Sequence, residues 1–277
     1  MELTHGILLA IVEGLTEFLP VSSTGHIILT STLLGINEDD FVKNYTVIVQ
    51  FGAIASVLVL YWQRFFQSLD FYKKLVLGFL PAGVVGLSLK NIIDDLLGSP
   101  SVVAWALVLG GIALIILDRR EYGNKSELEG NNEKQELKEE MNSKEGQSLG
   151  ELEVSYRQAF FIGLVQCLAF VPGVSRSAAT IMGGIWQGLD RKTAAEFSFL
   201  LAVPTLTGAT AIKLLKIAPT ITNDQLGIIV IGNLVAFVVG YLAIRLFIYY
   251  VSRFGFEKFG WYRIILGSLF ILFLHYS

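Results

Sequence analysis

Six long apolar segments constrain the fold of this chain more than any other feature of its sequence. Each approaches the ~20 residues that an α-helix needs to cross the ~30 Å hydrocarbon core of a bilayer. The segments carry few charged residues and lie at 44–62, 73–90, 101–118, 193–215, 224–250 and 260–276. The sequence therefore predicts an all-α polytopic membrane protein with six spanning helices.

Two shorter apolar segments precede the first span. At ~1.5 Å per residue, helices over 4–20 and 24–35 would reach only roughly 25 and 18 Å, so neither can cross the membrane. Pro20 ends the first helix because it lacks a backbone donor, and hydroxyl side chains that can cap the second helix follow at Ser22, Ser23 and Thr24. Broken backbone at membrane depth is tolerated where it is buried in protein. We therefore expect a re-entrant helical hairpin.

The same layout returns in the second half of the chain. Residues 157–171 and 178–189 are again short and apolar, Pro172 and Gly173 separate them, and three spans follow. A hairpin returns to the side it came from, whereas three spans do not, so the second copy must enter the membrane from the opposite face. Such an inverted-topology repeat places the two helix breaks face to face near the midplane. The expected units are a first repeat, a linker and a second repeat, at 1–118, 119–156 and 157–277.

The segment between the repeats is rich in Glu, Lys, Asn, Gly and Ser, although only 16% of the whole chain is charged. It has too little apolar content to fold alone, so we expect a flexible charged linker outside the membrane. The loops on its side of the membrane hold most of the basic residues, among them Arg119, Arg191 and Lys258. The positive-inside rule then makes the linker cytoplasmic and turns both termini outward.

The rest of the composition excludes several classes of function. Cys167 is the single cysteine, so the chain cannot form an internal disulfide, and no His/Cys cluster has the spacing of a zinc or redox site. The formal net charge is −3, and no basic stripe or aromatic platform points to nucleic acid.

The first break, EGLTEFLPVSSTGH from Glu13 to His26, puts polar chemistry into apolar surroundings. Glu13 and Glu17 are spaced to share one face of a helix, and their apolar neighbours disfavour the alternative of a solvated surface. Carboxylates are the ligands of hard cations, so this pair could hold Mg²⁺ or Ca²⁺. His26 could act as a general acid or base near neutral pH. The sequence leaves open whether a serine is a nucleophile or a phosphate ligand, the candidates being Ser22, Ser23 and Ser175.

The second break, PGVSRSAAT from Pro172 to Thr180, contains an arginine at membrane depth. Such a residue usually faces a protein cavity and has an anionic partner. Arg176 could pair with a carboxylate for structural reasons, the options being Glu13, Glu17 and Glu196, or it could bind a substrate anion. A guanidinium, hydroxyls and a helix N-terminus together match a phosphate, so we favour an anion site. The hydroxyls are those of Ser175, Ser177 and Thr180, and weaker supporting candidates are Glu196, Gln50 and Gln166.

These two segments closely resemble the signature segments of the bacitracin-resistance type undecaprenyl-diphosphate phosphatases. The similarity runs through nearly the whole chain and includes EFSFLLAVP, which begins at Glu196, although the charged linker looks longer than is usual in that family. The resemblance implies an integral membrane enzyme that hydrolyses undecaprenyl diphosphate to undecaprenyl phosphate and phosphate, recycling the lipid carrier of cell-wall synthesis. It also implies a divalent cation and an active site that faces the outer side of a bacterial plasma membrane. By position, the family's functional residues match Glu13, Glu17, Ser23, His26 and Arg176.

Two other interpretations of these motifs differ from this one. A different class of membrane lipid phosphatase carries PSGH and then SRxxxxxHxxxD, but Met182 stands where the histidine of that motif is required. A polyprenyl-lipid transporter or flippase could use the same phosphate site, because inverted repeats with broken helices are typical of transporters. In either case the expected partners are a polyprenyl diphosphate lipid and the bilayer, and the sequence leaves a monomer and a homodimer both open.

Overall fold

The computed structural model describes residues 1–37, 39–66, 68–89, 92–93, 96, 99–132 and 153–276, and all regular structure in these residues is helical. Among them, six helical segments are long and apolar enough to cross a membrane: Asp40–Leu60, Leu69–Ser88, Pro100–Arg120, Arg191–Thr220, Asn223–Phe254 and Glu257–Tyr276. The prediction of an all-α membrane protein with six spans is therefore confirmed.

The elements of the first half are α1 (Leu3–Thr16), α2 (Ser23–Leu33), α3 (Asp40–Ile48), α4 (Gln50–Leu60), η1 (Trp62–Phe66), α5 (Leu69–Ser88) and α7 (Pro100–Asn132). Those of the second half are α9 (Tyr156–Gln166), η2 (Cys167–Phe170), α10 (Arg176–Trp186), α11 (Arg191–Ile217), η3 (Ala218–Thr220), α12 (Asn223–Phe254) and α13 (Glu257–Tyr276). Each half therefore begins with a pair of short helices, and three candidate spans follow, as the sequence predicts.

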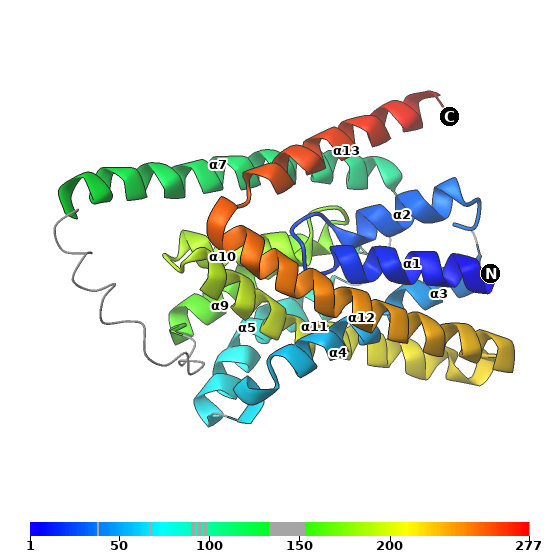
Figure 1. Cartoon of the computed structure of the whole chain (residues 1–277). Helices are drawn as coiled ribbons and strands as arrows, with labels where there is room; N and C mark the ends of the chain where they lie inside the picture. Colours follow the sequence, from blue (N-terminus) through cyan, green and yellow to red (C-terminus); the bar gives the residue numbers. More distant parts are fainter. Residues whose placement is uncertain are drawn as a thin grey trace.

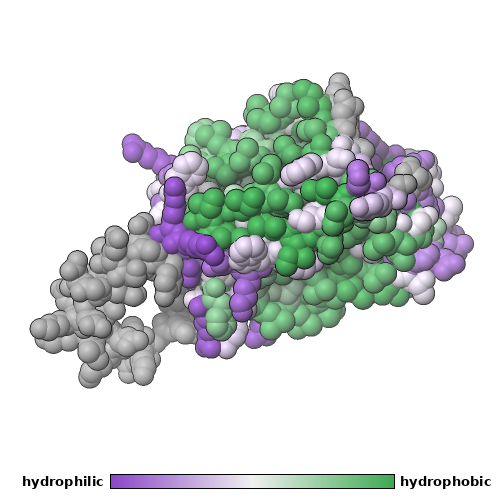
Figure 2. All heavy atoms as spheres, turned by 90° about the horizontal axis from the view of Figure 1, so that it is seen from above, coloured by the Kyte–Doolittle hydropathy of each residue, from purple (hydrophilic) through white to green (hydrophobic). Residues whose placement is uncertain are grey.

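Apolar side chains form the outside of the spanning region. Figure 2 shows one face of the molecule, on which hydrophobic residues cover the middle and hydrophilic residues gather toward its two ends. Large apolar side chains on the long helices are exposed, including Leu109 on α7, Leu234 and Leu246 on α12 and Leu269 on α13. A surface of this kind is stable in contact with lipid, whereas in water it would be an aggregation hazard.

The first predicted span is two helices, α3 and α4, that meet at Val49. The side chain of Asn233 on α12 accepts a hydrogen bond from the backbone amide of Gly52 (2.7 Å). A contact from another helix thus takes up an amide in the first turn of α4. Because Asn233 lies far along the chain, the local apolar pattern does not predict the division between α3 and α4.

The first part of the predicted linker is helical. Helix α7 continues to Asn132, past residue 118 where the third span was expected to end. Residues such as Arg119 and Arg120 have high helix propensity, so the helix can continue beyond the apolar segment. The middle of the predicted linker, 133–152, lies outside the described residues.

The two short-helix pairs, α1 with α2 and α9 with α10, have matching breaks. Ser22 (φ 72°) and Ser175 (φ 76°) are the two non-glycine residues with positive φ in the described chain. Each caps the helix that follows, because the Ser22 hydroxyl accepts from the Gly25 amide and the Ser175 hydroxyl from the Ala178 amide. A non-glycine residue with positive φ costs about 1–3 kcal/mol, and both breaks contain one next to the helix that follows. The predicted repeat would give this match, and the repeat itself stays a prediction.

The two pairs approach each other from opposite ends of the molecule. In Figure 1, α1 and α2 extend from their break toward the end where both termini lie, and α9 and α10 extend toward the other end. The first helix of each pair is packed closely against a span: a Cβ on Gly14 would overlap the Ala236 carbonyl of α12, and one on Gly163 would overlap the Gly78 carbonyl of α5. Small residues at such crossings let helix backbones approach closely. This arrangement agrees with an inverted repeat, while the re-entrant course of both pairs through a bilayer stays a prediction.

Candidate active site

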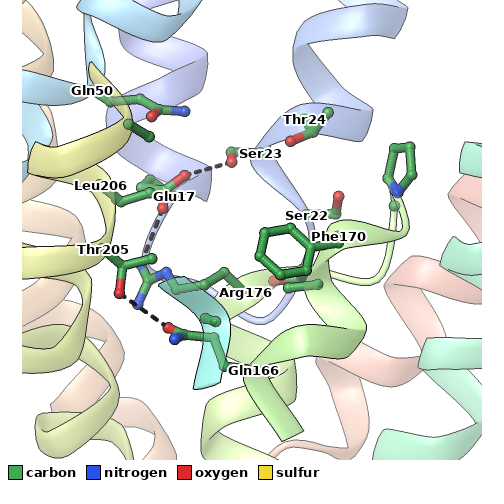
Figure 3. A pocket seen from close by; sticks show the side chains of 16 residues that line it. Glu17, Ser22, Ser23, Thr24, Gln50, Gln166, Phe170, Arg176, Thr205 and Leu206 are labelled. Carbon is green, nitrogen blue, oxygen red and sulfur yellow. Dashed lines mark hydrogen bonds and ion pairs between the residues drawn. The ribbon is translucent and has the colours of Figure 1, made fainter. Parts of the chain in front are cut away.

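A pocket lies where the two helix breaks meet, and both halves of the chain line it (Figure 3). Its polar lining residues are Glu17, Ser22, Ser23, Thr24, Gln50, Gln166, Ser175, Arg176 and Thr205. Its apolar lining residues are Ala82, Ala169, Phe170, Pro172, Gly173, Leu206 and Ala209. The pocket therefore offers both polar and apolar contacts, which an amphipathic ligand requires.

Glu17 and Arg176 form a buried ion pair across this pocket. Glu17 Oε1 lies 3.0 Å from Arg176 Nη2, and the two side chains are 5% and 9% exposed. Arg176 Nη1 also donates to the Ser198 carbonyl (2.8 Å), and the guanidinium lies over the ring of Phe18. Of the three carboxylates that the sequence offered as partners of Arg176, the structure selects Glu17.

Ser23 is the serine whose position suits nucleophilic chemistry. Its hydroxyl donates to Glu17 Oε2 (2.6 Å), which is the contact expected between a nucleophile and a general base. Ser22 and Ser175 also line the pocket, but their hydroxyls accept from the backbone amides of the helices that they cap. The hydrogen bonds therefore distinguish Ser23 from the two capping serines, which the sequence alone could not do.

Two other hydroxyls of the second break do not line the pocket. Ser177 and Thr180 are fully buried, so the expected contact with phosphate is replaced by contacts within the protein. The Ser177 hydroxyl donates to the Leu19 carbonyl (2.7 Å), and Thr180 Oγ1 lies 2.6 Å from Ser198 Oγ. These residues bind the second hairpin to the first break and to α11.

Glu13 lies one helical turn before Glu17 and is 1% exposed. Its Oε1 is buried and has no hydrogen-bond partner among the described residues. Two neighbouring carboxylates with an unpartnered oxygen fit a hard cation, which often binds through one or two carboxylates together with substrate phosphates. The described residues contain no cluster of three or more His, Cys, Asp or Glu side chains, so a cation here would need ligands from a bound phosphate.

His26 lies beside the pocket rather than on its wall. Its Nδ1–H donates to the Ser22 carbonyl (2.7 Å), and its Nε2 is 2.6 Å from the hydroxyl of Tyr262, whose ring stacks on the imidazole. The imidazole therefore holds the backbone of the first break, and its role as a general acid or base stays a prediction. Tyr262 was not foreseen, because it lies far away in the sequence.

Arg263 on α13 is the main residue that sequence reasoning missed. It is fully buried, and its guanidinium donates to five backbone carbonyls, those of Pro20, Ala106, Leu107, Gly173 and Val174. Pro20 belongs to the first break, and Gly173 and Val174 belong to the second, so one side chain holds both breaks together. Its signal in the sequence was an arginine inside the apolar segment 260–276, since ionisable residues within spans are rarely without a role.

The weaker candidates have different surroundings. Glu196 pairs with Arg64 (3.4 Å) rather than with Arg176, because Arg176 turns toward the first hairpin. Gln50 of α4 and Gln166 of α9 both line the pocket.

The chain was compared with known proteins. It matches the family model of "Bacitracin resistance protein BacA" over residues 6–269. A protein named undecaprenyl-diphosphatase from Bdellovibrio bacteriovorus is 46% identical, with 99% of this chain and 97% of the relative aligned. Proteins of the same name from Flavobacterium psychrophilum and Wolinella succinogenes are 48% and 44% identical, covering 98% and 99% of this chain and 96% and 99% of their own lengths.

Proposed function

The chain belongs to the family of bacitracin resistance protein BacA, and we infer that it is an undecaprenyl-diphosphatase. The reaction converts undecaprenyl diphosphate and water to undecaprenyl phosphate and inorganic phosphate. This hydrolysis recycles the lipid carrier for cell-wall polymers and confers bacitracin resistance. The relatives' shared name favours hydrolysis over the alternative of a lipid transporter.

The assignment of the active site rests on one observation. An acidic group of the first break and a guanidinium of the second, Glu17 and Arg176, meet in a single pocket that apolar residues also line. A diphosphate head group needs cationic and hydrogen-bonding partners, whereas the attached prenyl chain needs apolar contacts. The polar residues around the ion pair suit the head group, and Phe170, Leu206 and Ala209 suit the first part of the chain.

We propose that Ser23 is the nucleophile and Glu17 its general base. The Ser23 hydroxyl already donates to Glu17, so the carboxylate can take the proton as the serine oxygen attacks the terminal phosphorus. Arg176 binds the phosphoryl oxygens and stabilises the charge that develops on them, while Ser22 and Ser175 line the same pocket as further ligands. The bond to the bridging oxygen breaks and releases undecaprenyl phosphate, and water then hydrolyses the phosphoserine.

Glu13 and Glu17 are the residues that would hold a divalent cation, Mg²⁺ or Ca²⁺. The cation supplies charge stabilisation for the phosphoryl oxygens when it is bound. The unpartnered oxygen of buried Glu13 supports this assignment, because an isolated buried carboxylate oxygen is costly without a ligand.

The protein is a multi-pass bacterial membrane protein. We propose that it lies in the plasma membrane with the pocket accessible from the outer face. The distribution of basic residues supports this orientation, since Arg119 and Arg120 of α7 lie on the same side as Lys258 at the start of α13, where Arg119 pairs with Glu257.

The test uses purified protein in detergent, where transport cannot be scored. We expect the wild type to release phosphate from undecaprenyl diphosphate in the presence of Mg²⁺ or Ca²⁺. The same preparation in lipid vesicles provides the comparison. Lipid translocation in vesicles without phosphate release in detergent would contradict the enzymatic function.

A further inference from the structure

Two hydrogen-bond donors that belong to pocket-lining residues have no acceptor among the described residues. They are Gln166 Nε2 and Arg176 Nε, and both atoms are buried. Gln166 as a whole is 2% exposed, and its Oε1 accepts from the Thr205 hydroxyl (3.4 Å), which leaves its NH₂ group without a partner. Figure 3 shows the Gln166 and Arg176 side chains next to each other. A buried donor without a partner costs about 1–3 kcal/mol, so two at one place point to a ligand that accepts hydrogen bonds.

The position of Gln166 in the second half matches that of Glu13 in the first half. Gln166 precedes the left-handed Ser175 by the same number of residues as Glu13 precedes the left-handed Ser22. Gln166 is therefore the counterpart of Glu13 in the second half.

At neighbouring positions, too, the second half has different residue types from the first half. By the same spacing, Phe170 corresponds to Glu17 and Arg176 to Ser23. The first hairpin thus contributes acceptors and carboxylates, and the second contributes donors with no carboxylate at the matching positions. Such a division suits a ligand with anionic oxygens, which the second hairpin can bind without repulsion.

On this basis, and resting on the proposed function, we propose that Gln166 is a substrate-binding residue whose amide NH₂ donates to a phosphate oxygen of the diphosphate group. The Thr205 hydroxyl donates to the Leu201 carbonyl (2.8 Å) and lies 3.4 Å from Gln166 Oε1, and in this orientation of the amide the NH₂ group is available to the ligand. As a neutral donor, Gln166 binds a phosphate oxygen without competing with Arg176 for the Glu17 carboxylate. A carboxylate at this position would face the phosphates and repel them.

The kinetic test compares two substitutions in purified protein with undecaprenyl diphosphate as substrate. Gln166→Leu removes one neutral hydrogen bond, so we expect kcat/KM to fall about threefold to tenfold, mainly through KM. Gln166→Glu keeps the shape and places a negative charge beside the diphosphate, so we expect a loss of about a hundredfold or more. Gln187→Leu is the matched control, because this glutamine lies on the same hairpin but does not line the pocket. Gel filtration and thermal unfolding in detergent establish that each variant is folded.

A purely structural role would give a different pattern. Folded Gln166→Leu protein with kcat/KM within twofold of wild type would overturn the proposal, and so would a Gln166→Glu variant no worse than the leucine variant.

A binding measurement separates this proposal from the proposed function. Calorimetry with inorganic diphosphate in the presence of Mg²⁺ should show binding to the wild type and an affinity about threefold to tenfold lower for Gln166→Leu. If the wild type binds diphosphate but hydrolyses no lipid, the proposed function fails while the role of Gln166 is still decided by this comparison. Wild-type protein that neither binds nor hydrolyses would overturn both.

Discussion

Glu17 Oε1 and Arg176 Nη2 lie 3.0 Å apart, although one residue belongs to the first helix break and the other to the second. The contact joins the two halves of the chain at the pocket that also contains Ser23 and Gln166. We propose that a diphosphate entering the pocket gives Arg176 an anionic partner in place of Glu17. The Glu17 carboxylate would then be free to serve as base or cation ligand once the substrate is bound.

The first prediction concerns the stability of this pair. Removing one partner leaves the other buried and unpaired, so Glu17→Gln or Arg176→Met alone should destabilise the protein by about 3–5 kcal/mol. The double variant should recover part of that loss, because no uncompensated charge is left. Thermal unfolding in detergent measures the three variants. Equal stability of both single variants and the wild type would show that the pair is not formed.

Ser23 gives the second prediction. Ser23→Ala should lower kcat by at least about a thousandfold with little change in the unfolding temperature, because the nucleophilic oxygen is lost. Ser31→Ala is the matched control, since Ser31 is a buried serine on the same helix that bonds to the Ile28 carbonyl. Rapid acid quench with substrate labelled at the terminal phosphate should trap a phosphoenzyme in the wild type and none in Ser23→Ala. Retention of activity by Ser23→Ala would assign the attack to water.

Arg263 gives the third prediction. A lysine offers three donors on one nitrogen and cannot reach five carbonyls around both breaks, so Arg263→Lys should lower both the unfolding temperature and kcat/KM. Arg245→Lys on α12 is exposed and should behave as the wild type. An unchanged Arg263→Lys variant would mean that the breaks are held by other contacts, such as that of Ser177 with Leu19.

The fourth prediction concerns the cation. A chelator should abolish phosphate release, and added Mg²⁺ or Ca²⁺ should restore it. Glu13→Gln should raise the cation concentration that gives half-maximal activity by about tenfold or more, since one of two carboxylate ligands is lost. Glu2→Gln, at an exposed position on the N-terminal side of α1, provides the control. Activity that is unaffected by the chelator would remove the cation-binding role of Glu13 and Glu17.

The sequence predicted the spans and both breaks because these depend on local composition. Apolar length determines the six spans, and Pro20 and Pro172 lie within the breaks. The short helices end earlier than expected, α1 at Thr16 and α9 at Gln166. The sequence also pointed to Arg176, since an arginine at membrane depth needs a reason to be there.

Other features could not be predicted because they depend on long-range contacts. The sequence left three carboxylates as possible partners of Arg176. The choice of Glu17 depends on how the two helix pairs are oriented toward each other, which local sequence does not specify. The five partners of Arg263 are backbone carbonyls, which have no residue signature at all. His26 was expected at the reacting groups, but its contacts with the Ser22 carbonyl and Tyr262 became visible only in three dimensions.

The most direct test of the account is the rate of phosphate release from undecaprenyl diphosphate by the wild type, Glu17→Gln, Arg176→Ala and the double variant. If both groups act on one head group, each single variant should lose nearly all activity, and the double variant should lose little more than the worse of the two. A single variant with wild-type kcat/KM, or losses that multiply in the double variant, would contradict a shared site at the two helix breaks.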